Sequence, residues 1–442
     1  MCATMVGMLV SFSMENFRAF RDEAVLDLRR PGRSPVAAVP WGGDAKDGPP
    51  LYSVAAIYGA NASGKSALFR GVQWLQHLVC TSYRQGKVEA QPFRLDAESA
   101  GRPTHLSATF IADDGVCYAY GLAVLDGRVV EEWAERYTTP RPTLLFERDG
   151  ERFTYGAALA GPKKAIENTV SDSTLYLSAA AAGRFEALMP LYRWFADGLR
   201  CYDSGGHRTF YDTVFEELER DEGARRRVLG MLVESDFGLR DVQFRRRPLT
   251  EADKRLIEQH VERLAPQART YADFGETAIP DDVVEARFVH ETKSGVHPLE
   301  FDDESDGTKA MLCHAFVIDQ AITWGRTVVF DEIDASLHPL LVASLIRIFR
   351  SRKSNPLQAQ FIFTTHDVSL LEPTSPGGAA IGREDMWVTQ KGPDGVASLT
   401  PVADFKPRKD ENLRRRYLVG RFGGIPANSD YTHVGSAAGS DA

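Results

Sequence analysis

The chain has 442 residues, enough for two or three domains, and its 43% hydrophobic and 26% charged residues are ordinary for a globular protein. The net charge of −9 excludes a protein that holds nucleic acid by its overall charge and leaves only local basic patches for such contact. The five cysteines are scattered and include no CxxC pair, so we expect reduced thiols and no zinc site. No apolar run approaches the roughly 20 residues of a membrane span, and the first residues do not resemble a signal peptide. We therefore expect a cytoplasmic protein without a membrane segment.

Short strands dominate the first part of the chain. Residues 8–28 alternate apolar and polar residues around a turn, which predicts two strands, and residues 51–59 form an apolar run typical of a buried strand. A helical spacing follows over residues 66–80. Antiparallel strands joined by short turns are predicted over the segments 104–113, 116–125, 128–137 and 143–156.

The pattern becomes helical after residue 159, most clearly over 184–199 and 213–236, and strands return at residue 283. There a strand, a helix over about 308–323, a strand ending at Asp331, a second helix and a strand ending at His366 follow one another. We therefore predict an α/β fold whose core domain has a mixed central sheet and an antiparallel β-subdomain. The predicted parts are residues 1–159 and 283–426 of the core domain, an inserted, mainly helical lobe over 160–282, and a disordered end over 427–442.

One loop has the composition of a phosphate-binding loop. "GANASGKS", which begins at Gly59, fits the pattern G-x-x-x-x-G-K-[ST] between a predicted strand and a predicted helix. Backbone N–H groups of such a loop surround phosphates, Lys65 would reach the β- and γ-phosphates, and Ser66 would bind Mg²⁺. The alternative is a chance glycine-rich turn. The candidate ATP-binding residues are Gly59, Ala60, Asn61, Ala62, Ser63, Gly64, Lys65, Ser66 and Ala67.

Two later strands end in residues suited to nucleotide hydrolysis. "TVVFDEID" ends in acids, of which Asp331 would bind Mg²⁺ and Glu332 would act as general base toward the attacking water. "QFIFTTHD" ends at His366, the position at which ATP-binding-cassette proteins place a histidine that contacts the γ-phosphate. An ordinary charged strand end and a structural histidine are the alternatives.

A helix start and a loop complete the candidate site. "ESDGTKAML" resembles a variant cassette signature, in which Ser305 and Gly307 would contact the γ-phosphate held by a second copy of the chain. A plain helix cap at Ser305 or Asp306 is compatible with that function. "DASLHP" would form the loop beside the dimer partner, with Asp334 as its first residue.

Three further features leave alternatives open. Gln91 is a candidate for the glutamine that joins Mg²⁺ to the lobe, and "SMENFRAF" either lies near the nucleotide base or is a plain hairpin. Basic triplets begin at Arg225, Arg245 and Arg414; nucleic-acid contact through the lobe and solvated faces are both compatible with the first two.

The order of these motifs resembles one class of ATPase. Lys65 and Asp331 are 266 residues apart, the signature lies just before Asp331, and no N-K-x-D element of a GTPase is found. This layout is similar to that of the chromosome-maintenance (SMC), RecF and overcoming-lysogenization-defect (OLD) ATPases. "ESDGT" and "YLVGRFGGIP" resemble a bacterial subgroup of "AAA family" ATPases similar to AbiLii, RloA and the AriA ATPase of the PARIS anti-phage system.

The resemblance implies a cassette-type ATPase that binds ATP and Mg²⁺, closes as a homodimer or higher homo-oligomer over ATP, and controls a separate effector, a nuclease or toxin, after a phage-derived trigger. "YLVGRFGGIP" would dock on the nucleotide domain or on that effector. A DNA-repair or DNA-structure ATPase that acts directly on nucleic acid is the alternative function. A scaffold in which ATP only sets the oligomer is a third possibility.

Overall fold

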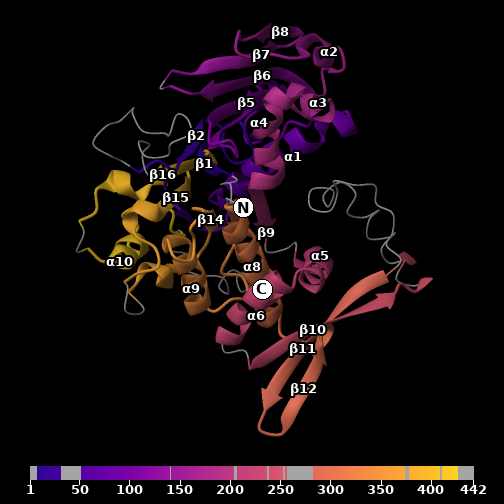
Figure 1. Ribbon diagram of the computed structural model, residues 1–442. Helices are drawn as coiled ribbons and strands as arrows, with labels where there is room; N and C mark the ends of the chain where they lie inside the picture. The colour runs from indigo at the N-terminus through magenta and orange to yellow at the C-terminus, as the bar shows by residue number, and fades with distance from the viewer. Residues whose placement is uncertain are drawn as a thin grey trace, which may run out of the picture.

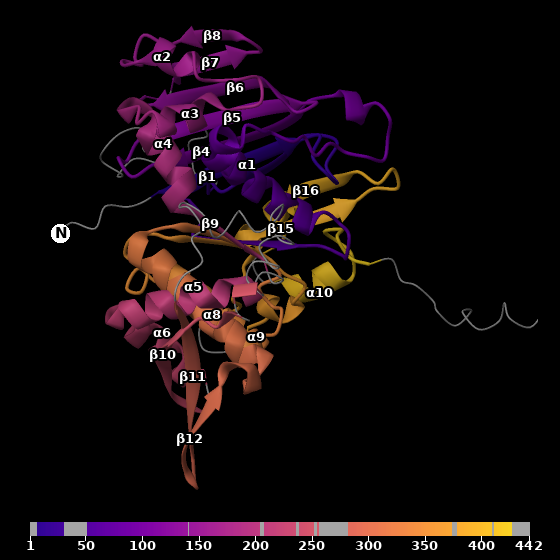
Figure 2. The same cartoon turned by 90° about the vertical axis from the view of Figure 1, so that its right-hand side faces the viewer.

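The computed structural model describes residues 7–30, 51–139, 141–203, 207–235, 238–251, 254–255, 282–373, 378–408 and 411–426. The predicted disorder of residues 427–442 and most of the loop predicted over 30–50 lie outside these ranges. The described chain contains three sheets, which follow one another from top to bottom in Figure 2.

The central sheet is mixed, as the sequence predicts. Five strands run parallel in the order β15-β3-β14-β13-β9, and β16 pairs antiparallel with β15 at one edge. Their bounds are β3 Val54–Tyr58, β9 Leu199–Asp203, β13 Thr327–Asp331, β14 Gln360–Thr364, β15 Met386–Lys391 and β16 Ala397–Pro401. Every residue of β3, β13 and β14 is buried, which explains their unbroken apolar runs.

The second sheet is the predicted antiparallel β-subdomain. Its seven strands have the order β2-β1-β4-β5-β6-β7-β8. They are β1 Met8–Glu15, β2 Ala24–Asp27, β4 Thr104–Ile111, β5 Cys117–Leu125, β6 Arg128–Tyr137, β7 Thr143–Asp149 and β8 Arg152–Tyr155. The predicted strands of the first part of the chain are thus confirmed, including the hairpin β7–β8.

Alternate residues of the central strands contribute to two hydrophobic cores. On β3, Ala55 and Ile57 belong to the core shared with the antiparallel sheet, whereas Val54, Ala56 and Tyr58 belong to the core on the opposite face. Helix α1 (Lys65–Gln85) fills the first core between the two sheets. Helices α8 (Asp306–Trp324) and α9 (Pro339–Arg350) cover the opposite face (Figure 1).

The segment 160–282 contains strands as well as helices. Helices α2 (Lys163–Glu167), α3 (Tyr176–Ala182) and α4 (Met189–Arg193) precede β9, which is an edge strand of the central sheet. The sequence predicts one helix over 184–199, but the structure has the short helix α4 followed by a π-helical turn, Trp194–Gly198, which leads into β9. Helices α5 (His207–Arg220) and α6 (Glu222–Glu234) follow, and both contact α8. The domain boundaries at residues 159 and 282 stay a prediction.

A third, three-stranded sheet projects from the α8 side of the molecule (Figures 1 and 2). It consists of β10 (Leu239–Pro248), β11 (Asp282–Thr292) and β12 (Gly295–Glu300), which pair antiparallel. Near the end of the chain, the short helix α10 (Leu413–Leu418) contacts the turn that follows β14.

Candidate nucleotide site

The predicted phosphate loop joins the end of β3 to the first turn of α1. Gly64, the last residue before the helix, has a φ of +114°, which is unfavourable for any residue with a Cβ. A Cβ there would also lie 2.9 Å from the Ala397 side chain and 3.1 Å from the Phe20 ring. Glycine is therefore required at this position by conformation and by space, which is how the loop brings its backbone close to the neighbouring β16 and to the turn around Phe20.

Lys65 lies inside the loop. The residue is only 5% exposed, and its Nζ donates to the carbonyl oxygens of Gly59, at 2.7 Å, and Ala60, at 3.0 Å. Burial lowers the pKa of Lys65 to about 8, although nearby carboxylates act in the opposite direction. The amine is thus held where a phosphate group could replace the loop carbonyls as its partner.

The end of β13 positions two acids through one hydroxyl group. Thr364 Oγ1 donates to Asp331 Oδ1 at 2.6 Å and accepts the Glu332 N–H at 2.7 Å. Asp331 is 8% exposed, and Glu332 has a φ of +56°, a left-handed conformation that few non-glycine residues adopt. The Thr364 hydroxyl therefore joins the Asp331 carboxylate and the Glu332 backbone at the end of β13.

Charges from separate strands meet at this edge of the sheet. Burial lowers the pKa of His366; the positive charge of Lys65 lowers it further, and Asp334, Glu332 and Asp331 oppose the shift. The same three carboxylates act on Lys65. In addition, the backbone N–H of His366 donates to Asp334 Oδ2 at 3.4 Å. The structure therefore brings together Lys65 at the start of α1 and four residues at or just after the ends of β13 and β14.

Ser66 and Asp331, the predicted Mg²⁺ ligands, suit a magnesium ion that also binds phosphate oxygens. Ser66 is exposed in the first turn of α1, and Asp331 presents a carboxylate at the end of β13. Among the residues that the structure describes, no group of three or more His, Cys, Asp or Glu side chains is arranged to hold a metal. A carboxylate and a hydroxyl are oxygen ligands of the kind that Mg²⁺ takes together with waters and phosphates, and the joint binding of Mg²⁺ by Ser66 and Asp331 stays a prediction.

Ser305 and Gln91 have structural partners within the chain. Ser305 is an exposed N-cap of α8, whose Oγ accepts the Thr308 N–H at 3.1 Å, so the helix-cap interpretation is correct. Its contact with a γ-phosphate, together with that of Gly307, needs a second copy and stays a prediction. Gln91 Oε1 accepts from Arg18 Nε at 2.6 Å, so this side chain is bound to the turn that follows β1. Its proposed link to Mg²⁺ also stays a prediction.

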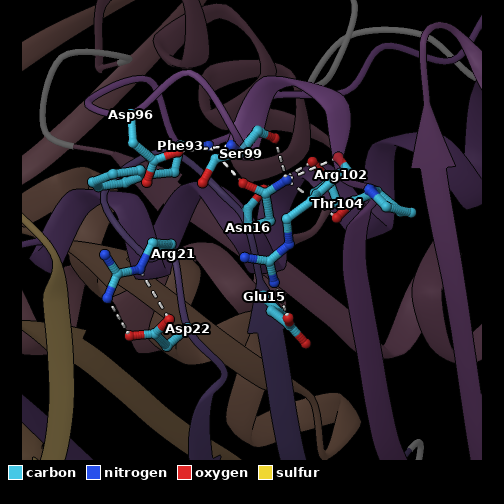
Figure 3. Close-up of polar contacts among 10 residues, drawn as sticks. Glu15, Asn16, Arg21, Asp22, Phe93, Asp96, Ser99, Arg102 and Thr104 are labelled. Carbon is cyan, nitrogen blue, oxygen red and sulfur yellow. Dashed lines mark hydrogen bonds and ion pairs between the residues drawn. The ribbon is translucent and has the colours of Figure 1, made fainter.

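The "NFRAF" turn follows β1 and contains a buried asparagine whose side chain is hydrogen-bonded. Asn16 is fully buried with a φ of +49°, and its Nδ2 lies 2.9 to 3.2 Å from the carbonyl oxygens of Ser99, Arg102 and Pro103 (Figure 3). Its Oδ1 accepts the Phe93 N–H at 3.1 Å. The Asn16 amide is therefore a structural group that joins the turn to residues 93–103.

The basic triplets are largely neutralised within the chain. Arg227 pairs with the buried Asp319 of α8 at 2.5 Å, which joins α6 to α8. Most of the other arginines also have acidic partners. The pairs are Arg225–Asp241, Arg226–Glu222, Arg246–Glu219, Arg247–Glu285, Arg414–Glu372 and Arg416–Glu411. The triplets therefore do not form the unpaired basic surface expected of a nucleic-acid groove.

Sequence reasoning missed two hydroxyl residues at the site. Thr364 precedes His366 in "FTTHD", so its proximity to the end of β13 follows from parallel pairing of the two strands. Thr389 on β15 shares a hydrogen bond of 2.6 Å with Ser63 of the phosphate loop. No local sequence signal marks Thr389, because the two residues are 326 positions apart.

Among the described residues, no helix is both long and apolar enough to span a membrane. The four described cysteines, Cys80, Cys117, Cys201 and Cys313, are free thiols.

Comparisons with known proteins address the family and the fold. A family model described as "AAA domain, putative AbiEii toxin, Type IV TA system" matches residues 54–158 and 162–372. An SMC head bound to the C-winged helix domain of ScpA aligns with a TM-score of 0.46 and 15% identity, over 89% of this chain and 97% of that chain. An SMC head derived from Pyrococcus furiosus has a TM-score of 0.41 and 14% identity, over 89% and 96% of the two chains. The recombination mediator RecF with ATP has a TM-score of 0.37 and 12% identity, over 89% and 99%.

No curated protein sequence gives a significant match. The family match covers most of the chain and includes the phosphate loop, Asp331, Glu332 and His366. The chain therefore belongs to the AAA-domain family that contains the putative AbiEii toxins of type IV toxin–antitoxin systems.

Proposed function

We propose that this chain is a cytoplasmic ATPase of bacterial anti-phage defence, which binds ATP, dimerises around it and thereby controls a separate effector protein. One observation carries the ATPase part of the proposal. Lys65, Asp331, Glu332, Asp334 and His366 converge at one edge of the central sheet, beside the glycine-rich loop that follows β3. The family description supports a toxin–antitoxin context.

Four residues of this cluster have distinct tasks in the proposed mechanism. The Lys65 ammonium leaves the carbonyl oxygens of Gly59 and Ala60 and binds the β- and γ-phosphates. Glu332 accepts a proton from the attacking water, and His366 donates a hydrogen bond to the γ-phosphate. Mg²⁺, held by Ser66 and Asp331, would neutralise phosphate charge.

The effector would be controlled through the closing and opening of a dimer of this chain. Ser305 and Gly307 of a second copy would complete the γ-phosphate contacts, so the closed dimer would persist only while the γ-phosphate is present. Hydrolysis would then open the dimer and change its hold on the effector. The pairing of most arginines in the triplets with acids of the same chain weighs against the alternative in which the protein acts directly on DNA.

The test combines two variants with two matched controls. Lys65→Ala is expected to abolish ATP binding, and Glu332→Gln to bind ATP but to hydrolyse it roughly 10²- to 10⁴-fold more slowly and to accumulate as a dimer. Lys353→Ala and Glu147→Gln remove an exposed lysine and an exposed glutamate elsewhere and are expected to behave as wild type. Hydrolysis by Glu332→Gln at the wild-type rate would contradict the assignment of the general base.

The effector is sought by affinity purification of tagged Glu332→Gln and wild type from cells that carry the native locus. A stoichiometric protein partner that is present in one nucleotide state and absent in the other supports the switch. Nucleic acid without a protein partner, together with ATPase activity stimulated by DNA, would support the DNA-structure ATPase. Tight ATP binding with turnover far below about one per minute, against roughly 1–10³ per second for ordinary enzymes, would support the scaffold.

A further inference from the structure

Thr389, Ser63 and Tyr58 form a layer of hydrogen-bonded residues that supports the phosphate loop. Thr389 of β15 is fully buried, and its Oγ1 donates to the carbonyl oxygen of Tyr58 at 3.3 Å. The Ser63 hydroxyl, which is also buried, therefore donates to Thr389 Oγ1 across 2.6 Å. Tyr58 immediately precedes the loop and Ser63 is its last residue before Gly64, so one hydroxyl group ties together both ends of the loop.

The C-terminal segment, residues 412–426, packs against this layer. Gly424 has a φ of +67°, and a Cβ there would lie 3.0 Å from the carbonyl oxygen of Thr389 and 3.4 Å from the Cα of Gly59, in addition to overlapping Val388. The tail glycine thus touches both the strand that carries Thr389 and the first residue of the phosphate loop. Only a residue without a side chain fits between them.

Two tyrosines hold the segment in this position. The buried Tyr417 hydroxyl donates to the Gly424 carbonyl oxygen at 2.9 Å. Its ring packs edge-to-face on Tyr58, with the ring centroids 5.6 Å apart. The Tyr58 hydroxyl in turn donates to the carbonyl oxygen of Asp367, the residue after His366, at 3.0 Å. The segment is therefore connected to the phosphate loop and to the histidine strand end.

We propose that Thr389 is a positioning residue for the phosphate loop, and that residues 412–426 brace it so that ATP affinity depends on the docking of the C-terminal segment. This inference rests on the proposed ATP site and adds its regulation. Because coupling between two binding events is reciprocal, ATP would also strengthen docking of the segment. A partner that displaced residues 412–426 would lower ATP affinity without touching the nucleotide.

The first test changes the hydroxyl group. Thr389→Val keeps the shape of the side chain but leaves the Ser63 hydroxyl without this partner, and is expected to weaken ATP binding roughly three- to tenfold. Thr389→Ser restores the hydroxyl and is expected to remain within about twofold of wild type. The measurements are the Kd for a fluorescent ATP analogue with Mg²⁺, and the kcat and KM of ATP hydrolysis. We expect KM to rise with little change in kcat, because the loop binds the ground state and the transition state alike.

The second test changes the tail glycine. Gly424→Ala is expected to weaken ATP binding at least as much as Thr389→Val. Gly420→Ala is the matched control, because Gly420 has a φ of +75° in the same segment but a Cβ there meets only the flexible end of Ile425, at 3.0 Å. Hydrogen exchange of wild type is expected to show slower exchange over residues 412–426 when ATP is bound.

The outcomes separate this inference from the proposed function. If wild type does not bind ATP, the proposed function fails. If wild type binds ATP but folded Thr389→Val binds it equally well, or Gly424→Ala and Gly420→Ala have equal affinities, the inference fails. Should a variant not fold, the exchange measurement on wild type decides: unchanged exchange over residues 412–426 on addition of ATP overturns the coupling.

Discussion

Replacement of Asn16 tests whether the "NFRAF" turn is structural or binds nucleotide. Asn16→Gly keeps the left-handed backbone accessible but leaves the Phe93 N–H and the carbonyl oxygens of Ser99 and Arg102 without their side-chain partner. Each unsatisfied buried group costs roughly 1–3 kcal/mol of stability. Because structural relaxation and water offset part of that summed cost, we expect the free energy of unfolding to fall by about 2–4 kcal/mol. Asn16→Ala should lose about 1 kcal/mol more, because alanine is strained at a φ of +49°.

The assay is urea denaturation of both variants, with the Kd for ATP measured on the folded protein. Asp126→Gly is the control, because Asp126 has a φ of +48° in an exposed turn, and we expect its effect to stay within about 0.5 kcal/mol. A loss of less than about 1 kcal/mol in Asn16→Gly, or weaker ATP binding at unchanged stability, would refute the structural role.

Two further predictions follow from charges. Burial lowers the pKa of Lys65 to about 8, whereas bound phosphates favour the charged amine. Above about pH 8 the free protein loses this proton and must take it up again to bind ATP. ATP affinity should therefore fall by up to roughly tenfold per pH unit above about pH 8, and binding should be accompanied by proton uptake. A Kd that stays constant between about pH 7.5 and 9.5 would contradict this. Arg227→Ala leaves the carboxylate of Asp319, whose side chain is 4% exposed, without its ion-pair partner. The free energy of unfolding should fall by roughly 2–4 kcal/mol, and any affinity for DNA should not change. Arg226→Ala is the control, because it breaks an exposed ion pair and should cost less than about 1 kcal/mol. Equal effects of the two substitutions in urea denaturation, or a DNA affinity lost only in Arg227→Ala, would show that the pair has another role.

The strands and the candidate catalytic residues could be predicted from the sequence because their signals are local. An apolar run that ends in Asp331 or His366 specifies both a buried strand and the residues at its end, and parallel pairing places those ends together. The positive φ of Gly64 is likewise a local backbone feature that the loop motif marks, although Ala397 and Phe20 also leave no space for a side chain there. The inserted segment was harder, since the helical pattern over 184–199 did not reveal that Leu199–Asp203 joins the central sheet as β9.

The partners of those residues were decided by the tertiary structure. The conformation of Asn16 is specified by carbonyl groups more than 80 residues away, and the basic triplets, which in sequence suggest a charged surface, turn out to be mostly paired with acids on other elements. Thr389 and Gly424 contact the phosphate loop from the other end of the chain. By itself, the sequence determined which residues stand in a pattern suited to nucleotide binding and hydrolysis, because that pattern depends on residue type and short spacing. Only the fold determined what holds these groups in place, because hydrogen bonds and packing depend on distances in space that spacing along the chain does not encode.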